Sequence, residues 1–394
     1  MLTKKDIFAK SSFIAWAIAV GAYFFQFPFS KLSSLILPFL FIYIALQIPN
    51  IKIPKNKVYL SLLALFVVFM CFQGIRAIVL GISFSRILRF AAILTVIPFS
   101  CFIKDENFNQ KKELFLNLAM IKSIILIFIG TIIVHDGDFR VFRDWAYSFG
   151  LGDIYFLNRF IPKVQVHGNA LLVIAFMLDC LSDKKITKRK ILLLLGVLVA
   201  GNFAFILALL AFIAWQAGTF AIKLAKRNKY VKYISIAVII IAVAVLVPYF
   251  ISKIVEKAAT SNAVRLEQAK VFLDANPFIG DGLGCWVTAQ TEHLSYNGEI
   301  YFELQTLYIF KQVGIITLLL FYAVTLIPMY YAGKNRFIFY LIYLFFSFWN
   351  PYCFDVTQII TIILAINISQ LGEVNDKIAY YSIPSGLLRQ RKHS

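Results

Sequence analysis

Long apolar runs recur from one end of this chain to the other, and they constrain its fold more than any other feature. A helix of about 20 apolar residues crosses a bilayer, and lipid offers no partner for an unpaired backbone group, so such runs fold as helices. Of the 394 residues, 60% are hydrophobic, and the mean hydropathy is +0.79. The sequence therefore predicts an all-α, polytopic membrane protein in which residues 1–394 form a single integral membrane domain.

We expect about twelve transmembrane helices in this chain. One apolar run, 190–224, is too long for a single crossing, because a helix of 35 residues would extend ~52 Å against a hydrocarbon core of ~30 Å. A break at Gly201-Asn202 would divide the run into a short hairpin. The expected spans are 12–27, 32–49, 58–80, 86–103, 114–134, 168–181, 190–201, 203–224, 233–252, 305–331, 337–349 and 355–371.

Lysine and arginine are divided unequally between the two sets of connecting segments. The set that includes both termini holds 25 of them, and the opposite set holds nine. Because cytoplasmic segments carry the excess of positive charge, both termini are expected in the cytoplasm, with a polar, disordered tail at 372–394. The two long loops, 135–167 and 253–304, then face outward, and their arginines need a reason other than topology.

The charge and the cysteines restrict the choice of partners and cofactors. The net charge is +19, but Lys and Arg lie mostly in short turns between spans, where topology explains them, so nucleic acid is not an expected partner. The five cysteines are scattered, with no C-x-x-C and no His/Cys cluster, so we expect no metal site and no disulfide framework. No nucleotide motif is present either, and no cofactor is expected.

The first long loop contains Arg140, Arg143 and Arg159 and closes with Lys163 and His167. The first two arginines are three residues apart and would share a face if this segment is helical. Arginine holds phosphate oxygens bidentately and keeps its charge, so this set would suit a pyrophosphate at the membrane surface. The alternative is a set of local salt bridges to Asp136, Asp138, Asp144 and Asp153.

Arginines also occur at the start of the fourth span. Arg86 and Arg89 open that span from the outside, three residues apart, and would face a lipid phosphate beneath the loops. The alternative is that both side chains extend to lipid headgroups. Arg76 and Lys122 lie deeper in spans, where a charge is a functional candidate, but neither has a partner that the sequence identifies.

The second long loop begins with a segment of helical periodicity. Val264, Val271, Phe272 and Ala275 share one face at helical spacing and predict an amphipathic helix. After Asn276-Pro277, three glycines at 280, 282 and 284 would allow a tight turn close to a ligand.

Glu303 and Gln305 follow where the chain re-enters the apolar layer. A carboxylate at this boundary is costly unless it is paired or used, and burial would make it a stronger base. A structural pair with a loop arginine is the alternative. His293 and His167 are weaker candidates in the two loops.

Three local features carry a resemblance to a known superfamily. They are HGNALL at 167–172, the R-x9-ANPFIGDGLG segment from Arg265 to Gly284, and the E-x-Q run at 303–305 that leads into KQVGII. With about twelve spans and two long outer loops, the chain resembles the O-antigen polymerase and ligase superfamily over most of its length. The resemblance implies a GT-C-like membrane fold with two large periplasmic loops that contain functional arginines.

One departure from the ligase pattern favours a polymerase of the Wzy type. Ligases of this superfamily show His followed by Asn, Ser or Gln, then Gly about ten residues later, where the chain re-enters the membrane. Here Glu303 and Gln305 stand at that place, with Gly314 beyond them, and His293 is followed by Leu294.

The resemblance to polymerases also implies a reaction. A glycan on undecaprenyl pyrophosphate would be transferred to the non-reducing end of a repeat unit on the same carrier, in lipopolysaccharide biosynthesis at the bacterial inner membrane. No metal would be needed, and a chain-length regulator is a candidate partner beside membrane lipid. The implied catalytic residues are Glu303, Arg265 and His167, and the implied pyrophosphate-binding residues are Arg86, Arg89, Arg140, Arg143 and Arg159.

Two other functions remain open. A ligase would use the same donor but transfer the glycan to lipid A–core. A transporter or flippase would place polar groups at mid-membrane and would show repeated halves, whereas this chain concentrates its charges in two unequal outer loops.

Overall fold

The protein is mainly helical, and several of its helices are long enough to cross a bilayer. The computed structural model describes residues 4–105, 107–136, 140–157, 161–182, 185–225, 233, 261–292, 295–299, 302–348, 350–367 and 380–382. Within them, five helices have the length and apolar composition of a membrane span. These are α1 (Lys4–Phe25), α3 (Lys57–Val79), α5 (Phe108–Asp136), α9 (Phe203–Ala225) and α12 (Gln305–Ala332).

Six shorter helices also match expected spans. They are α2 (Ser33–Leu46), α4 (Phe84–Ser100), α7 (Ala170–Ser182), α8 (Lys188–Ala200), α13 (Lys334–Ser347) and α14 (Val356–Asn367). A helix of 12 or 13 residues extends ~18–20 Å, which is less than the ~30 Å hydrocarbon core. The predominantly helical fold is therefore confirmed, and its long apolar helices are compatible with a membrane protein. The number of crossings stays a prediction. The span expected at 233–252 lies outside the described residues, apart from Tyr233.

The break expected within 190–224 is present. Helix α8 ends at Ala200, Gly201 adopts φ 72°, and α9 begins at Phe203. A left-handed residue at this position ends a helix at low cost only when it is glycine. The side-chain Oδ1 of Asn202 then accepts a hydrogen bond from the backbone N–H of Ala204 at 2.9 Å and caps the next helix.

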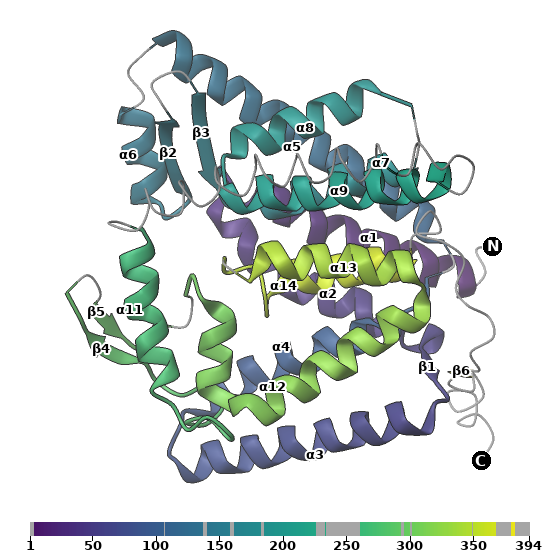
Figure 1. Cartoon of the computed structure of the whole chain (residues 1–394), viewed down its shortest axis with the longest axis vertical. Helices are drawn as coiled ribbons and strands as arrows, with labels where there is room; N and C mark the ends of the chain where they lie inside the picture. The colour runs from purple at the N-terminus through teal and green to yellow at the C-terminus, as the bar shows by residue number, and fades with distance from the viewer. Residues whose placement is uncertain are drawn as a thin grey trace.

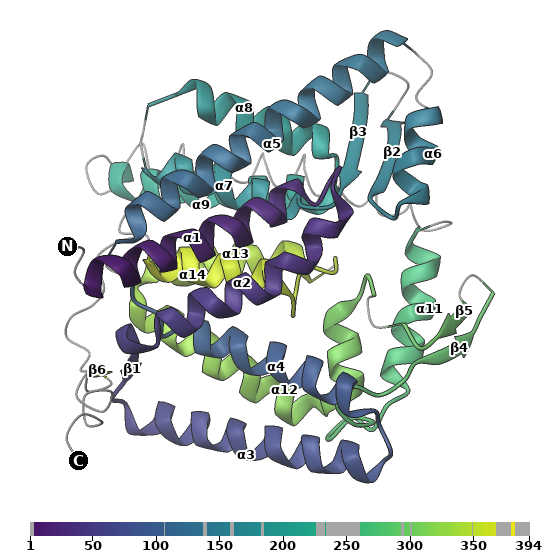
Figure 2. The ribbon, with the colours of Figure 1, turned by 180° about the vertical axis from the view of Figure 1, so that it is seen from behind.

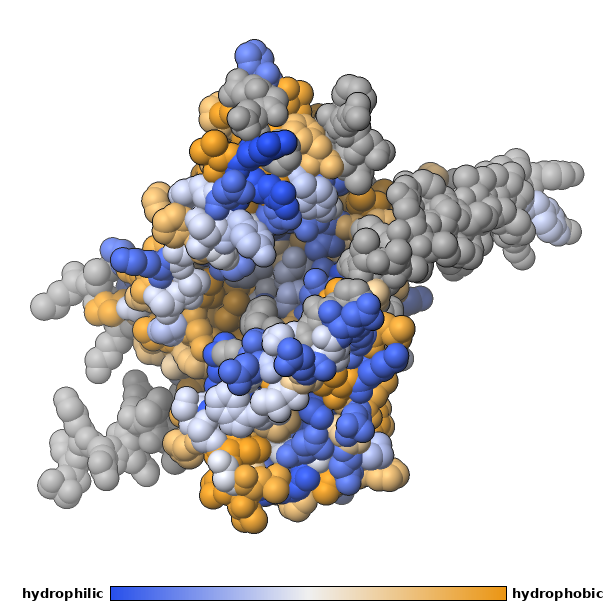
Figure 3. Space-filling view, turned by 90° about the vertical axis from the view of Figure 1, so that its left-hand side faces the viewer, coloured by the Kyte–Doolittle hydropathy of each residue, from blue (hydrophilic) through white to orange (hydrophobic). Residues whose placement is uncertain are grey.

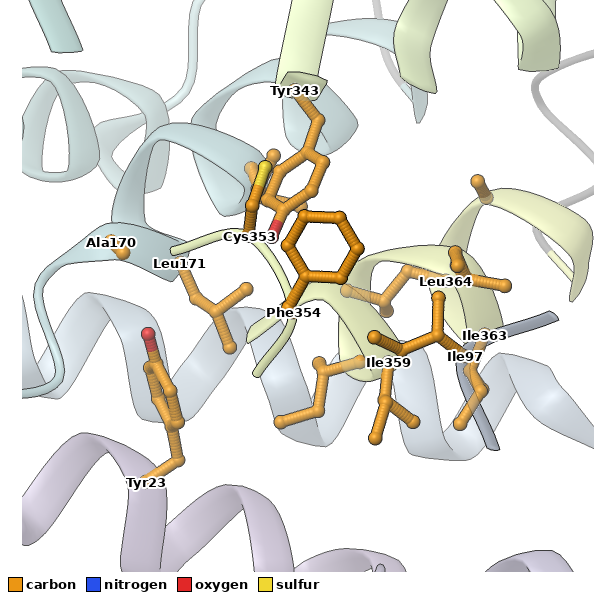
Figure 4. Packing of buried hydrophobic residues seen from close by; sticks show 14 of the residues in the cluster. Tyr23, Ile97, Ala170, Leu171, Tyr343, Cys353, Phe354, Ile359, Ile363 and Leu364 are labelled. Carbon is orange, nitrogen blue, oxygen red and sulfur yellow. The ribbon is translucent and has the colours of Figure 1, made fainter. Parts of the chain in front are cut away.

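The helices form a layered bundle. Helices α1, α2, α13 and α14 lie in the middle, with α5, α7, α8 and α9 on one side and α3, α4 and α12 on the other (Figures 1 and 2). Helix α14 is buried from Thr357 to Ile366, and its side chains pack beside Leu171 and Phe354 (Figure 4). Helix α3 lies at an edge and exposes most of its apolar residues, as expected for a helix that faces lipid.

The segments of the two long loops lie at one end of the bundle. They form α6 (Arg140–Ser148), the β2–β3 hairpin (Gly152–Leu157 and Ile161–Val166), α11 (Ser261–Leu273) and the β4–β5 pair (Thr288–Gln290 and Ser295–Asn297). The beginning of α1 and a third strand pair, β1–β6 (Lys52–Pro54 and Tyr380–Ser382), lie at the opposite end (Figure 1).

Short antiparallel strand pairs satisfy backbone groups of the described segments outside the spans. This small strand content is compatible with the predicted all-α class. The expected disorder of the tail 372–394 is wrong at Tyr380–Ser382, since these residues pair with Lys52–Pro54.

Candidate functional site

Two of the predicted catalytic residues are in contact. The Nε atom of Arg265 on α11 lies 2.9 Å from the Oε2 atom of Glu303, which stands just before α12. The Glu303 side chain is 52% exposed and that of Arg265 is 29% exposed. Glu303 lies in the turn that precedes the helix and is not buried, and it forms the pair with a loop arginine that was the structural alternative. Its position gives a paired carboxylate that solvent and a substrate can reach.

Gln268 fixes the position of this pair. Its Oε1 accepts a hydrogen bond from the backbone N–H of Leu304 at 2.7 Å, and its Nε2 donates to the Tyr296 hydroxyl at 2.6 Å. It thus joins α11 both to the residue after Glu303 and to β5. Gln268 is not among the site residues predicted from the sequence. Its three-residue spacing from Arg265 was the available signal, since such residues are neighbours on a helix.

An aromatic cluster supports the same junction. The Phe302 ring lies 5.0 Å from that of Phe272, 5.0 Å from that of Tyr296 and 4.5 Å from that of Tyr308, between ring centroids. Phe272 lies on the predicted apolar face of α11 and is fully buried. Such tilted and edge-to-face contacts hold rings in defined positions, so the cluster provides a rigid base beneath Glu303.

The glycine-rich turn after α11 docks on a break in α12. Gly314 has φ 68° and ψ 177° inside that helix, and a Cβ there would lie 2.3 Å from the carbonyl oxygen of Phe278. The backbone N–H groups of Asp281 and Gly282 donate to the carbonyls of Lys311 and Gln312 at 2.7 and 3.0 Å. The expected tight turn is present, and its glycines allow close approach to the α12 backbone.

Helix α3 and an ion pair hold this docked turn. Gln73 donates from Nε2 to the carbonyl oxygens of Ile279 and Val313, at 3.0 and 2.9 Å. Arg76 donates from Nη1 to the same Ile279 oxygen at 2.9 Å, so its partner is a loop carbonyl that the sequence does not identify. Lys311 and Asp281 form an ion pair with an Nζ–Oδ2 distance of 2.7 Å.

Arg86 holds the second loop in place through hydrogen bonds to its backbone. Its Nε donates to Gly284 O at 2.8 Å, and its Nη1 donates to Gly298 O at 2.9 Å. Its Nη2 donates to Cys285 O at 3.0 Å and to the Tyr308 hydroxyl at 3.1 Å. These bonds use four of its five N–H donors, and the side chain is buried beneath the ring of Trp286.

This position corrects the prediction that Arg86 binds pyrophosphate, because too few donors remain for a bidentate contact. Arg89 lies one helical turn further along α4 and is exposed. It keeps its place among the predicted pyrophosphate-binding residues.

Two predicted arginines of the first loop, Arg140 and Arg143, lie on α6, so the helical condition for their sharing a face is met. Both Arg140 and Arg143 are exposed. Arg143 forms an ion pair with Asp153, with an Nε–Oδ1 distance of 2.9 Å, and this hydrogen bond raises the pKa of Arg143. Arg159 lies outside the described residues.

His167 occupies the turn between β3 and α7. Its backbone N–H donates to Leu151 O at 2.9 Å, and its backbone oxygen accepts from the Lys122 ammonium at 3.2 Å. The side chain keeps contact with solvent, but partial desolvation and the nearby Lys122 charge lower the pKa of His167. His167 therefore belongs to the first-loop region, whereas Arg265 and Glu303 belong to the second.

The end of the molecule that carries both loops is rich in hydrophilic residues, with a hollow between its two halves (Figure 3). Among the described residues, no group of three His, Cys, Asp or Glu side chains is placed to hold a metal ion. The arrangement offers an accessible carboxylate for proton transfer and exposed arginines for an anion. No protein-family model, curated protein or solved structure matches the chain.

Proposed function

We propose that this protein is a membrane-embedded glycosyltransferase of the O-antigen polymerase type. It transfers a growing glycan from undecaprenyl pyrophosphate to the non-reducing end of a repeat unit on the same carrier. The observation that carries the proposal is the Arg265–Glu303 pair before α12. It places an accessible carboxylate in the loop whose glycine-rich turn and E-x-Q run resemble the superfamily.

In this reaction, a hydroxyl oxygen of the acceptor sugar attacks the anomeric carbon of the donor, and the bond from that carbon to the pyrophosphate oxygen breaks. Glu303 takes the hydroxyl proton, and Arg265 positions the Glu303 carboxylate through their contact. The leaving pyrophosphate gains negative charge, which fixed cations stabilise. Arg89, Arg140 and Arg143 are the candidates for this role, because they are exposed and positively charged. Arg159 is included because of its position in the sequence of the same loop.

His167 fits a binding role in the same reaction. Because its pKa is lowered, its imidazole is neutral at pH 7 and can both donate and accept a hydrogen bond with a sugar hydroxyl. In the proposed orientation, the loops face the periplasm, and both termini lie in the cytoplasm of a bacterial inner membrane.

Reconstitution tests the proposed function. The purified protein in proteoliposomes receives lipid-linked repeat units extracted from its source strain after deletion of this gene. A ladder of polymer lengths on the carrier lipid is expected. Transfer only to added lipid A–core would identify a ligase instead. Movement of the lipid-linked unit between leaflets without any new glycosidic bond would identify a flippase.

A further inference from the structure

An apolar groove opens beside the first long loop, apart from the Arg265–Glu303 pair. Its volume is about 650 Å³. One wall is the outer half of α5, with Ile129 and Ile132, and Phe27 closes it after α1. The other wall is α6, with Phe142 and Trp145. Its lining is almost wholly apolar, so hydrocarbon is a more favourable occupant than water.

The groove exists because α6 is amphipathic. Its apolar face packs by ring contacts, with centroid distances of 5.3 Å between Phe142 and Trp145 and 6.0 Å between Phe27 and Trp145. Its polar residues include Arg140 and Arg143, which are exposed. The Arg143–Asp153 ion pair is itself exposed, so a phosphate can compete with the carboxylate for this arginine. One helix of nine residues therefore presents an apolar wall and two cations side by side.

This combination matches a lipid with an anionic phosphate head. A hydrocarbon chain gains by leaving water for the groove, and arginine binds phosphate oxygens. The groove also lies near His167, one of the predicted site residues. The Phe27 ring lies 5.0 Å from the ammonium of Lys122, and that ammonium donates to the backbone oxygen of His167 at 3.2 Å. A chain in the groove would thus bring its head group close to the loop that contains His167.

We propose that the groove binds the polyisoprenyl chain of a lipid-linked pyrophosphate substrate, with the arginines of α6 at its phosphates. The identity of this lipid rests on the proposed function. Binding itself does not require catalysis, so the two proposals can fail separately.

Photo-crosslinking tests the groove. The protein in nanodiscs is irradiated with undecaprenyl pyrophosphate that carries a diazirine in its isoprenoid chain, and labelled peptides are identified by mass spectrometry. Label is expected in α5 and α6, and excess unlabelled undecaprenyl pyrophosphate should suppress it. Equal labelling by a phosphatidylglycerol with the same diazirine, unaffected by that competitor, would show that ordinary bilayer lipid fills the groove and would overturn the proposal.

Matched variants locate the bound chain. Ile132→Trp and Val141→Trp enlarge residues that line the groove and are already 43% and 77% exposed, so neither disturbs the packed core. Displacing about two buried methylene groups should weaken labelling roughly tenfold. The control is Val134→Trp, at a residue of α5 that is 53% exposed and does not line the groove. Equal labelling of all three variants would contradict the assignment.

The same samples separate this proposal from the proposed function. Labelling that excess unlabelled undecaprenyl pyrophosphate suppresses, without any polymer formation, would overturn the proposed polymerase activity and support lipid binding in the groove. Polymer formation without labelling in α5 and α6 would support the proposed polymerase activity and overturn the proposal that the groove binds the polyisoprenyl chain.

Discussion

Arg86 and Arg89 lie three residues apart near the start of α4, and their side chains have opposite surroundings. Arg86 is buried and bonded to the second loop, whereas Arg89 is exposed. Arg86→Ala leaves several buried acceptors unpaired and should reduce the free energy of unfolding by about 3 kcal/mol or more. Arg89→Ala should change it by less than about 0.5 kcal/mol while it weakens binding of the lipid pyrophosphate. Thermal unfolding in detergent measures the first effect, and equal melting temperatures would contradict it.

Glu303 allows catalysis to be separated from stability. An exposed ion pair contributes ~0–1 kcal/mol, so Glu303→Gln should leave the melting temperature nearly unchanged. Loss of a general base should lower the polymerisation rate by roughly 10²–10⁴. Glu299→Gln, an exposed carboxylate in the same loop, is the control and should keep its rate. Polymer made by the Glu303 variant at the native rate would exclude Glu303 as the base.

His167 predicts a dependence of stability on pH. Its pKa is lowered in the folded protein, so the unfolded chain takes up a proton first as the pH falls through about 6.5. The unfolded state then binds more protons, and stability decreases toward acid. His167→Asn should make the melting temperature fall less steeply between about pH 7 and 5. Parallel curves for the two proteins would show that His167 does not cause the slope.

At the scale of elements, the break in α12 positions the glycine-rich turn. The sequence predicts this span, 305–331, as one continuous helix, and the structure divides it at Gly314. Before Gly314, the carbonyl oxygens of Lys311 and Gln312 accept hydrogen bonds from the docked turn. After it, the backbone N–H groups of Ile315 and Ile316 donate to the turn's carbonyls. Such a break is hard to predict, because a single glycine within an apolar helix also occurs without a kink.

Gly314→Ala tests this interface. A Cβ would lie 2.3 Å from Phe278 O on a residue with φ 68°, so we expect a loss of roughly 1–3 kcal/mol in stability, or more. Gly74→Ala in α3 is the control, since its Cβ would have no neighbour within 4 Å and alanine favours helix. Thermal unfolding compares the two variants. A Gly314 variant as stable as the Gly74 variant would mean that the turn does not dock as described.

The described segments of both long loops lie at the end of the molecule opposite the β1–β6 pair (Figure 1). The proposed orientation therefore predicts which cysteines an impermeant maleimide reaches in intact cells whose outer membrane is permeabilised. Ser148→Cys on α6 and Gln290→Cys on β4 should be labelled from the periplasm. Lys55→Cys, beside β1, should be labelled only after the inner membrane is disrupted. The reverse pattern would invert the orientation.

The native cysteines should give little background in this experiment. Cys101, Cys285 and Cys353 are buried, and burial raises the pKa of the Cys285 thiol in the second loop to about 11. Maleimide reacts with the thiolate, which is scarce at neutral pH for such a group. Cys71 is exposed on α3, which has the length and apolar composition of a membrane span, so in the proposed orientation lipid would shield it from an impermeant reagent.

Features that depend on local composition were predictable from the sequence. The lengths of the apolar runs determine where helices form, because lipid requires every backbone group to be paired within its own segment. The break at Gly201 also follows from nearby residues. The same holds for the tight turn at the glycines of the second loop.

Which of the candidate residues are available for chemistry depends on tertiary packing, and the sequence alone does not determine it. Arg86 and Arg89 look equivalent in sequence, but the partners of Arg86 lie 198 to 222 residues further along the chain. Arg265 and Glu303 meet because Gln268 and the aromatic cluster join α11 to the start of α12. Such contacts depend on how distant helices pack, and no local pattern of charge or hydropathy encodes them.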